Sequence, residues 1–558
     1  MRRAGILTLG AFAASTGTFV SVFSPPRELT KRRREWFVGD SSDQTLSWVA
    51  ESSRSAFRFA RSAFVVAYVT YNYTKLRQLD SNSESYRDSV VETHRRCAER
   101  VLRCCRENQG IFIKIGQYVS TLSPILPSEW TETLKQLQDK ANYRPFEEIA
   151  EIVLEDLGIG SLDEVFVQFD ETPVAAASLA QVHRATLRNN RRVAVKVQYA
   201  GLSRQVAADL WTLNVLLNFV SYWFGEAFEF SWLLPEIESM ADVELDFRQE
   251  LENAERMRCL LRERDDIYIP ETIKELSGRR VLTMEFIDAM RFDEIGTTET
   301  NLDPRNVAST ILGVFGDMIF QYGFIHCDPH GGNLMVRSKP NASDPRDHQV
   351  VLLDHGMYRR IEPEFRIAFC NLWCSLLTRD RRAVVESAAH LGMNARGADA
   401  LSLVLTFRGL GSRTALGQKM SKRERRTLRE RYRNVSAERI NNFVRSLPRD
   451  MLFVLRTMSI VRSLNRELGG TTKERLLSFA ECAVRGRSVP VSDRSMRPSK
   501  THPIAFARRP LNKPLDIEAV DVSASLLNAT WIALSVWAMR LRVSIYDALL
   551  QTLSFLYR

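Results

Sequence analysis

The feature that most constrains the fold of this chain is a series of polar residues set among apolar ones. Lys196 stands inside the apolar run V-A-V-K-V, and Glu244 follows 48 residues later in V-E-L-D-F. Asp328 and Asn333 stand five apart in H-C-D-P-H-G-G-N, and Asp354 ends the run V-V-L-L-D. Charged groups in apolar surroundings cost free energy unless the fold brings partners to them. The series therefore predicts a domain in which distant segments converge on one polar site.

The amino-acid composition limits the classes of protein to which the chain can belong. Of the 558 residues, 45% are hydrophobic and 26% are charged, which excludes a wholly disordered chain, a collagen and a polytopic membrane protein. The net charge of +10 fits an anionic membrane surface, a nucleotide ligand or a mitochondrial address, and does not require nucleic acid. The 8 cysteines include no C-x-x-C pair, so neither a zinc ribbon nor a disulfide scaffold is indicated.

Hydrophobic periodicity divides the chain into helical and strand-rich parts. Runs typical of strands occur at 165–167, 182–186 and 193–197, with Asn189-Asn190 as a hairpin turn, and two more lie within 268–287. A few strands followed by a mostly helical half predict an α+β, bilobal, protein-kinase-like fold with helical extensions at both ends. The expected parts are 1–40 (targeting segment or membrane anchor with a basic flank), 41–157 (helical extension), 158–288 (N-lobe), 289–484 (helical C-lobe) and 485–558 (linker and helical tail).

Lys196 and Glu244 stand in the order of a phosphate-binding pair. In kinases the lysine of a strand near the start of the fold pairs with a glutamate from a following helix and holds the α- and β-phosphates of ATP. The sequence therefore predicts an ion pair between Lys196 and Glu244. Taken alone, Lys196 is explained as well by a strand-edge lysine whose ammonium reaches solvent.

The segment from His326 to Asn333 predicts a catalytic loop. Its D-x-x-x-x-N spacing is that of the kinase loop in which the aspartate handles a proton and the asparagine binds magnesium. Asp354, in D-x-G after an apolar run, matches the second magnesium ligand. A transition-metal site from His326, Asp328 and His330 is an alternative, which Pro329 disfavours because it breaks helical spacing. A plain structural loop is the other alternative.

Four motifs together make the chain resemble the UbiB/aarF-domain family of atypical kinases over roughly residues 84–480. They are K-x-G-Q at Lys114, Gly116 and Gln117, A-A-A-S-L-A-Q-V-H at 175–183, E-x-D at 244–246, and H-x-D-P-H-x-G-N at 326–333. The chain is most similar to the eukaryotic branch that holds aarF-domain-containing kinases five and one, the fifth being favoured. It departs from the family at Gly331, where proline is usual, and at His355, where the phenylalanine of D-F-G is usual.

The resemblance implies a role for each matched residue. Asp328 would be the base or the group that positions water, and Asn333 and Asp354 would bind Mg²⁺. The K-x-G-Q segment would fold over the side where a protein substrate docks, with Lys114 reaching toward the nucleotide. The residues expected to contact ATP are Ala175, Ala176, Ala177, Ser178, Gln181, Val182, Lys196, Met284, Glu285 and Phe286.

The N-terminal residues predict a targeting signal or a membrane anchor. Residues 4–23 carry no charge, and the basic run 31–34 follows. The stretch matches a mitochondrial presequence or anchor, a secretory signal, or a single membrane span of about 30 Å. We expect a mitochondrial, membrane-associated protein with a possible N-terminal span.

The sequence and the resemblance together favour an ATP-binding, Mg²⁺-dependent atypical kinase or ATPase. The family implies support of coenzyme Q or other lipid metabolism. The expected partners are a nucleotide, anionic membrane lipids or a lipid substrate, and coenzyme Q biosynthesis proteins, with no nucleic acid. A nucleotide-gated pseudokinase scaffold and a protein Ser/Thr kinase remain as alternatives.

Overall fold

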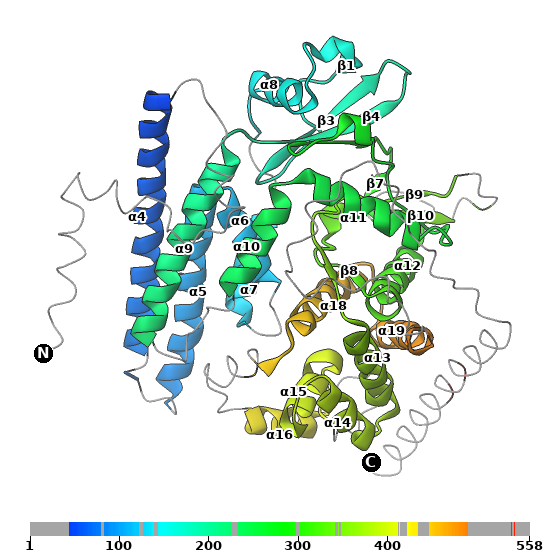
Figure 1. Cartoon of the computed structure of the whole chain (residues 1–558). Coiled ribbons are helices and arrows are strands. Elements are labelled where there is room, and N and C mark those ends of the chain that lie inside the picture. Colours follow the sequence, from blue (N-terminus) through cyan, green and yellow to red (C-terminus); the bar gives the residue numbers. More distant parts are fainter. Residues whose placement is uncertain are drawn as a thin grey trace, which may run out of the picture. The chain divides into compact units, whose positions relative to one another are not determined.

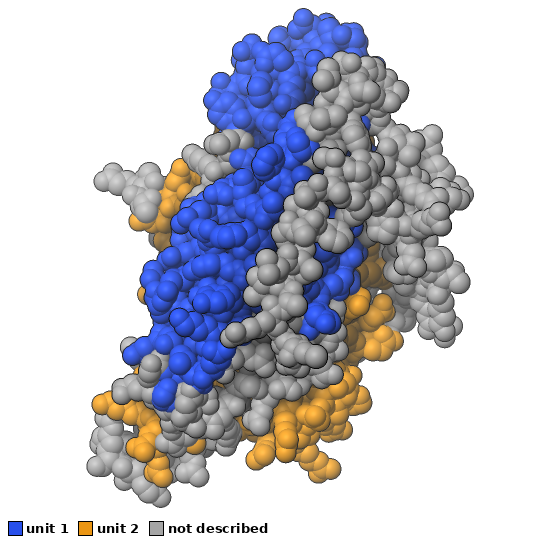
Figure 2. Space-filling view, turned by 90° about the vertical axis from the view of Figure 1, so that its left-hand side faces the viewer, with its two compact units in different colours: residues 1–120, 127–247, 276–282 blue, residues 121–126, 248–275, 283–558 orange. Residues whose placement is uncertain are grey.

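The computed structural model forms two compact units. Unit 1 comprises residues 1–120, 127–247 and 276–282, and unit 2 comprises residues 121–126, 248–275 and 283–558; Figure 2 shows unit 1 in blue and unit 2 in orange. The residues that the structure describes are 44–76, 78–79, 83–121, 126–138, 143–224, 233–296, 302–340, 344, 347–410, 412, 421–432, 443, 446–488, 537 and 541.

Unit 1 begins with a group of helices. Its helices before the sheet are α4 (Gln44–Leu76), α5 (Glu84–Asn108), α6 (Ile111–Ser120), α7 (Ser128–Lys135) and α8 (Phe146–Leu157), and after the sheet come α9 (Leu202–Phe224) and α10 (Leu233–Glu244). Helix α4 packs on both α5 and α9 (Figure 1). Arg58 and Asp209 form a buried ion pair between α4 and α9, although burial raises the pKa of Asp209 to about 6. This pair joins the N-terminal extension to a helix that follows the sheet.

The sheet of unit 1 confirms the strands expected near 165–197. Its strands are β1 (Phe166–Phe169), β2 (Ala175–Ala176), β3 (Ala180–Leu187), β4 (Arg192–Gln198) and β6 (Val281–Glu285), of which β6 continues into unit 2. The order is β1-β3-β4-β6, and β2 pairs with β3. The predicted turn joins β3 and β4 as an antiparallel hairpin, in which Asn190 takes a φ of 61°. Asparagine tolerates this left-handed conformation better than most residues, which explains its place in the turn.

Unit 2 carries two further sheets and the helix that leads to the loop 326–333, the predicted catalytic loop. Its strands are β5 (Ile267–Tyr268), β7 (Met290–Arg291), β8 (Phe324–His326), β9 (Leu334–Ser338), β10 (His348–Leu352) and β11 (Tyr358–Arg360). One sheet has the order β5-β10-β9-β7, and β11 pairs with β8 in the other. Helix α11 (Phe247–Leu260) runs from the end of unit 1 into unit 2.

Helix α12 (Pro304–Asp317) changes into a π-helix at Met318–Tyr322, immediately before β8. Phe320 lies in the last turn of this helix, where carbonyl groups have no partner within the helix, and the buried side chain of Arg366 binds its carbonyl. Its guanidinium donates to the Phe320 carbonyl at 2.8 Å and to the Gly486 carbonyl at 2.7 Å. Gly486 must be a glycine, because a Cβ there would lie 2.1 Å from the Phe320 oxygen. The chain before the catalytic loop is therefore fastened to the end of α19.

Helices form the rest of unit 2. They are α13 (Pro363–Thr378), α14 (Arg381–His390), α15 (Ala395–Thr406), α16 (Lys422–Tyr432), α18 (Arg449–Glu467) and α19 (Thr472–Arg487). Helix α19 packs on α12 and α13. Phe320, Phe369, Trp373 and Phe479 are fully buried and contact one another at the centre of this core. Burial of such large aromatic side chains contributes a large share of the stability of a core.

Several expectations fall on residues that are not described. The N-terminal segment 1–40 and most of the linker and tail 485–558 lie outside the described residues. Among the helices that are described, none combines the length and the apolar character needed to cross a membrane.

Candidate functional site

Lys196 lies on β4, as the apolar run predicted. Val193, Val195 and Val197 are buried on one face of this strand, while Lys196 faces the other way. Its ammonium lies 5.1 Å from the ring centroid of Phe247, the first residue of α11. An aromatic face attracts a cation, so Phe247 contributes to holding Lys196 in place.

Glu244 binds the lysine of the K-x-G-Q segment. Lys114 Nζ lies 2.6 Å from Glu244 Oε1, and the two side chains are 14% and 16% exposed. The sequence analysis paired Glu244 with Lys196 instead. The difference arises at the helix end: α10 stops at Glu244, and the Glu244 carbonyl accepts a hydrogen bond from Gln198 Nε2 at 3.0 Å. The E-x-D motif therefore falls on a break between α10 and α11, which local periodicity did not reveal.

The glycine and glutamine of K-x-G-Q dock α6 onto a neighbouring turn. Gly116 is buried, and a Cβ at this position would lie 2.2 Å from Leu137 Cδ1 and 3.4 Å from Cys105 Sγ. Gln117 Nε2 donates to the Leu137 carbonyl at 2.8 Å. The two residues thus bring α6 into close contact with the segment around Leu137, one by lacking a side chain and the other by a hydrogen bond.

The Ala-rich loop is a tight turn between β2 and β3. The Ala177 amide donates to the Ala180 carbonyl at 2.8 Å, and the Tyr199 hydroxyl donates to the Ala177 carbonyl at 3.1 Å. Arg144 lies over the Tyr199 ring, and burial raises the pKa of Tyr199 to about 12. Ser178 Oγ is buried in this loop without a hydrogen-bond partner. Buried hydroxyl groups are nearly always satisfied, so Ser178 is an exception among the described residues.

Gln181 was expected to contact nucleotide, and its side chain is instead bound inside unit 1. The side chain is fully buried, its Oε1 accepts from the Arg144 amide at 2.8 Å, and its Nε2 lies 2.9 Å from His183 Nε2. His183 Nδ1 donates to the Asp170 carbonyl, so Nε2 is the acceptor, and burial lowers the pKa of this imidazole. Val182, the next residue of β3, is half-buried.

Met284, Glu285 and Phe286, which were expected to contact ATP, lie at the end of β6 and just beyond it. Met284 is buried, and Glu285 Oε2 accepts a hydrogen bond from the Tyr268 hydroxyl at 2.5 Å. The Glu285 side chain is therefore bound to β5, and the Glu285 amide donates to the Glu271 carbonyl at 2.9 Å.

The loop 326–333 of unit 2, which the sequence predicts to be catalytic, brings Asp328 and Asn333 together. Asn333 Nδ2 donates to the Asp328 carbonyl at 3.3 Å, and the Asn333 carbonyl accepts from the Leu353 amide at 3.0 Å. The second bond joins the loop to the residue before Asp354. A Cβ on Gly331 would lie 2.8 Å from Phe292 Cδ1, so this glycine lets the loop pack closely on Phe292.

Asp328 is held by a buried arginine from α18. Arg456 Nη2 donates to Asp328 Oδ1 at 3.0 Å, and Arg456 Nη1 lies 3.2 Å from the Met357 sulfur. The Asp328 amide donates to His326 Nδ1 at 3.1 Å. Complete burial lowers the pKa of His326 to about 4, so this imidazole is neutral near pH 7. Asp328 is thus fixed from its backbone and from its carboxylate.

Asp354 lies at the end of β10, as the D-x-G pattern predicted. Its Oδ1 accepts from the Gly356 amide at 2.8 Å. His355, the unusual residue of this motif, is buried: its Nε2 lies 3.2 Å from the Leu352 carbonyl and its Nδ1 lies 3.0 Å from the Tyr358 hydroxyl. Because a carbonyl only accepts, Nε2 carries the proton and Nδ1 accepts. The buried His355 ring therefore joins the Leu352 carbonyl to the Tyr358 hydroxyl through two hydrogen bonds.

Two residues of this region escaped the sequence analysis. Arg456 lies 128 positions after its partner Asp328, and no local pattern marks it. Glu250 is 3% exposed, and its Oε2 lies 3.8 Å from the position of a Cβ on Gly356, beside the D-x-G turn. The run D-F-R-Q-E offered a signal, because Glu250 follows Phe247 by three residues and thus shares its side of α11.

The transition-metal alternative gains no support. His326 Nδ1 and His330 Nδ1 both accept hydrogen bonds from backbone amides, of Asp328 and Gly332. In the part of the chain that the structure describes, no group of three or more His, Cys, Asp or Glu side chains is arranged to hold a metal ion.

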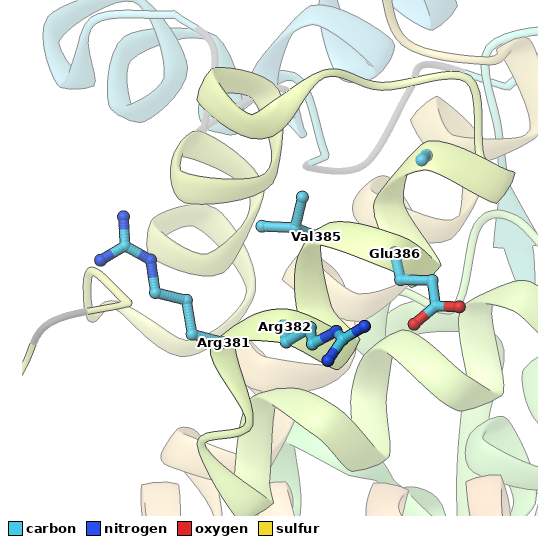
Figure 3. Close-up of a pocket in the computed structure, with 5 residues that line it drawn as sticks. Arg381, Arg382, Val385 and Glu386 are labelled. Atoms are coloured by element: carbon cyan, nitrogen blue, oxygen red, sulfur yellow. The ribbon is translucent and has the colours of Figure 1, made fainter.

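A surface hollow lies elsewhere in unit 2, on α14 (Figure 3). It measures about 650 Å³ and is lined by Arg381, Arg382, Val385, Glu386 and Ala389. The Arg381 side chain points away from the other labelled side chains (Figure 3). None of the residues predicted for the site lines this hollow.

A lysine on a strand, D-x-x-x-x-N in a loop and D-x-G after a strand define the protein-kinase-like class of fold. The sequence profile of the ABC1 atypical kinase-like domain matches residues 136–388. The chain is 36% identical to AarF domain-containing protein kinase 1 of Xenopus laevis, over 77% of this chain and 82% of that protein. The mouse protein of the same name is 37% identical over the same shares of the two chains. The chain therefore belongs to the ABC1 atypical kinase-like family.

The chain is also similar to two further proteins. The probable serine/threonine-protein kinase abkD of Dictyostelium discoideum is 37% identical over 77% of this chain, which spans 61% of the length of abkD. Among solved structures, the complex of Rv3197 with erythromycin from Mycobacterium tuberculosis has a TM-score of 0.43 and 21% identity, and covers 68% of this chain and 94% of that chain. The animal relatives named here carry the name kinase 1, one of the two members that the sequence analysis proposed.

Proposed function

We propose that the chain binds ATP with Mg²⁺ and acts as an atypical kinase or ATPase that supports coenzyme Q or other lipid metabolism at a mitochondrial membrane. The observation that carries the proposal is the catalytic loop, in which Asp328, Asn333 and the residue before Asp354 are joined by hydrogen bonds. This arrangement gathers two carboxylates and one amide oxygen in a single unit. Kinases use that set of groups to handle a proton and to bind magnesium.

Asn333 and Asp354 suit Mg²⁺, which prefers oxygen ligands. The Asn333 amide nitrogen donates to the Asp328 carbonyl, and this orientation leaves the amide oxygen for an ion. The Gly356 amide fixes one carboxylate oxygen of Asp354. Magnesium, when bound, would neutralise charge on the phosphates of ATP. Asp328, oriented by Arg456, would accept or direct the proton of the attacking group.

The nucleotide half of the proposal rests on unit 1. Lys196 supplies a cation for the phosphates, and Ser178 Oγ supplies a buried hydroxyl that has no hydrogen-bond partner in the described part of the chain. A nucleotide that satisfied this hydroxyl would remove the cost of burying it unpaired. Alanines at 175–177 make the covering loop stiffer than the glycines that kinases ordinarily use.

A nucleotide-gated scaffold without turnover is a second candidate. The ion pair of Lys114 with Glu244 favours it, because the pair commits an acidic residue of the site to the N-terminal extension. A protein Ser/Thr kinase is a third candidate, against which stands the lack of an A-P-E sequence after Asp354.

Hydrolysis of ATP by the full chain tests the proposal. We would measure turnover with and without Mg²⁺, and with and without vesicles that contain anionic phospholipid. We expect turnover that requires Mg²⁺ and is raised by the vesicles, and that is lost in Asp328→Asn and in Lys196→Ala. Asp450→Asn is the matched control, because it also removes a carboxylate bound to an arginine, Arg359, and should retain turnover.

The possible results separate the candidates. Nucleotide binding without turnover under any condition would favour the scaffold, and the same turnover in wild type and in Asp328→Asn would contradict catalysis at the proposed loop. Transfer of phosphate to a protein substrate rather than to water or lipid would favour the protein kinase. Failure to bind any nucleotide would refute the whole proposal.

A further inference from the structure

Three arginines gather on α18 and α19 of unit 2, the helices drawn in gold and orange in Figure 1. Arg462 and Arg466 lie one helical turn apart on α18, so they share one side of that helix. Arg475 lies near the start of α19. Arg466 acts electrostatically on Arg462, and Arg462 acts on Arg475, so the three positive charges form one continuous group, the arginine cluster.

Arg475 is the buried member of the arginine cluster. It is 3% exposed, and its Nη2 is buried without a hydrogen-bond partner. Among the described residues, no acidic side chain interacts with it. Burial and the charge of Arg462 together lower the pKa of its guanidinium to about 10. Fully buried arginines are rare unless they are paired, because the charge loses its hydration.

Three other arginines of unit 2, two of them buried and one half-buried, show how such a charge is normally satisfied. Arg366 donates to two carbonyls, Arg456 binds Asp328, and Arg264 binds both Asp266 and Asp317. Arg475 has no comparable arrangement within the described part of the chain. Arg475 is therefore an exception among these arginines, and a bound anion could supply the hydrogen-bond acceptors that it lacks.

The acidic residues nearest in sequence are engaged elsewhere. The Glu474 carboxylate accepts from the Thr471 amide at 2.7 Å as part of the cap of α19. Glu467 Oε1 accepts from the Ser463 hydroxyl at 3.0 Å. Arg462 itself lies 4.6 Å from the centroid of the Phe407 ring, which orients its guanidinium without neutralising it.

We propose that the arginine cluster binds the phosphate group of a phosphate monoester, at a site separate from the residues assigned to ATP. Guanidinium groups match the oxygens of phosphate, which accepts two parallel N–H···O bonds from one arginine. Arg475 forms the floor of the site, half-buried Arg462 its wall and exposed Arg466 its entrance. A single phosphate group would supply the negative charge and the acceptors that Arg475 lacks.

Binding of glycerol 3-phosphate to the full chain tests this proposal, with chloride as the compensating salt at constant ionic strength. We expect wild type to bind it and to unfold at a higher temperature in its presence. Arg475→Met should weaken binding by about tenfold to a hundredfold, the range for loss of a hydrogen bond to a charged group. Without ligand this variant should unfold no lower than wild type, because it removes an unpaired buried charge.

Further variants keep the test specific. Arg462→Met should weaken binding as well, and it serves as the second variant if Arg475→Met fails to fold. Arg262→Met is the matched control: it removes one positive charge from an arginine that is 63% exposed, and it should bind like wild type. Lys196→Ala should also retain binding, which separates this site from the proposed nucleotide site.

Vesicles distinguish the two sources of such a phosphate group. Cosedimentation with phosphatidate vesicles but not with phosphatidylcholine vesicles, lost in Arg475→Met, would assign the site to a lipid headgroup. Binding of glycerol 3-phosphate alone would assign it to a soluble metabolite. The proposal is overturned if wild type binds neither probe, or if Arg475→Met and Arg462→Met bind both as tightly as wild type.

Discussion

Gly116→Ala is the substitution whose effect the structure predicts most directly. A new Cβ would lie 2.2 Å from Leu137 Cδ1, so Leu137, which is 4% exposed, would have to move by more than an ångström. Overpacking of this kind costs about 1–3 kcal/mol of the free energy of unfolding. Alanine in a helix interior gains about 1 kcal/mol over glycine. We therefore expect a net loss of about 0–2 kcal/mol, which a single variant would not resolve clearly.

A double-mutant cycle with Leu137→Ala isolates the steric part. Leu137→Ala alone creates a cavity and should cost about 2–5 kcal/mol. In the double variant the clash is gone, so the two changes should together cost about 1–3 kcal/mol less than the sum of their separate costs. The helix propensity and cavity contributions cancel in this comparison.

Urea unfolding followed by circular dichroism measures the four proteins of the cycle. Gly313→Ala in α12 is a control. The atoms nearest to a Cβ there are the ends of the flexible Arg264 side chain, at 3.4 Å, so the change should be neutral or slightly stabilising. Additive costs within about 0.3 kcal/mol, the usual tolerance for independent sites, would refute the argument that Gly116 is required by the contact with Leu137.

Three further outcomes are expected. Lys114→Met and Glu244→Gln should show a coupling of about 1–2 kcal/mol in a double-mutant cycle, between the values for exposed and buried ion pairs, and additive effects would disprove the pair. Arg366→Met should lower the free energy of unfolding by about 2–4 kcal/mol, because the carbonyls of Phe320 and Gly486 each lose a charged donor. Arg379→Met, which removes one donor to Ser412, is the milder control. Burial lowers the pKa of His183, so below about pH 6.5 the imidazole is protonated in the unfolded chain but not in the folded chain. The free energy of unfolding of wild type should therefore fall as the pH drops through this range, and it should fall less in His183→Asn. Urea midpoints at several pH values measure this difference.

The local parts of the fold were predictable because their signals are local. The alternation of V-A-V-K-V gave the strand β4, and Asn189-Asn190 gave the turn of the β3–β4 hairpin. The five-residue spacing of Asp328 and Asn333 gave a loop in which the two residues are hydrogen-bonded. In each case the residues that determine the local backbone conformation and the residues that contact one another lie within the same short stretch of sequence.

The partners of the site residues were harder to predict, because they come from distant segments. Gln198 binds the Glu244 carbonyl where α10 ends, and Arg456 binds the Asp328 carboxylate. Gln181 appears in a motif associated with nucleotide binding, yet its partners Arg144 and His183 make it an internal anchor. Spacing along the chain identifies which residues are polar and close in sequence, but not which buried group satisfies each of them.

The reliance of the catalytic loop on the C-terminal helices has a consequence for biosynthesis. Asp328 is bound by an arginine 128 positions later, and the carbonyl of Phe320 shares the Arg366 guanidinium with that of Gly486. Proteins are made from the N-terminus, and domains fold as their segments emerge from the ribosome. The loop can therefore reach its final form only after α18 and α19 have been synthesised, so a chain interrupted before residue 456 would carry every recognisable motif and still lack a completed catalytic loop.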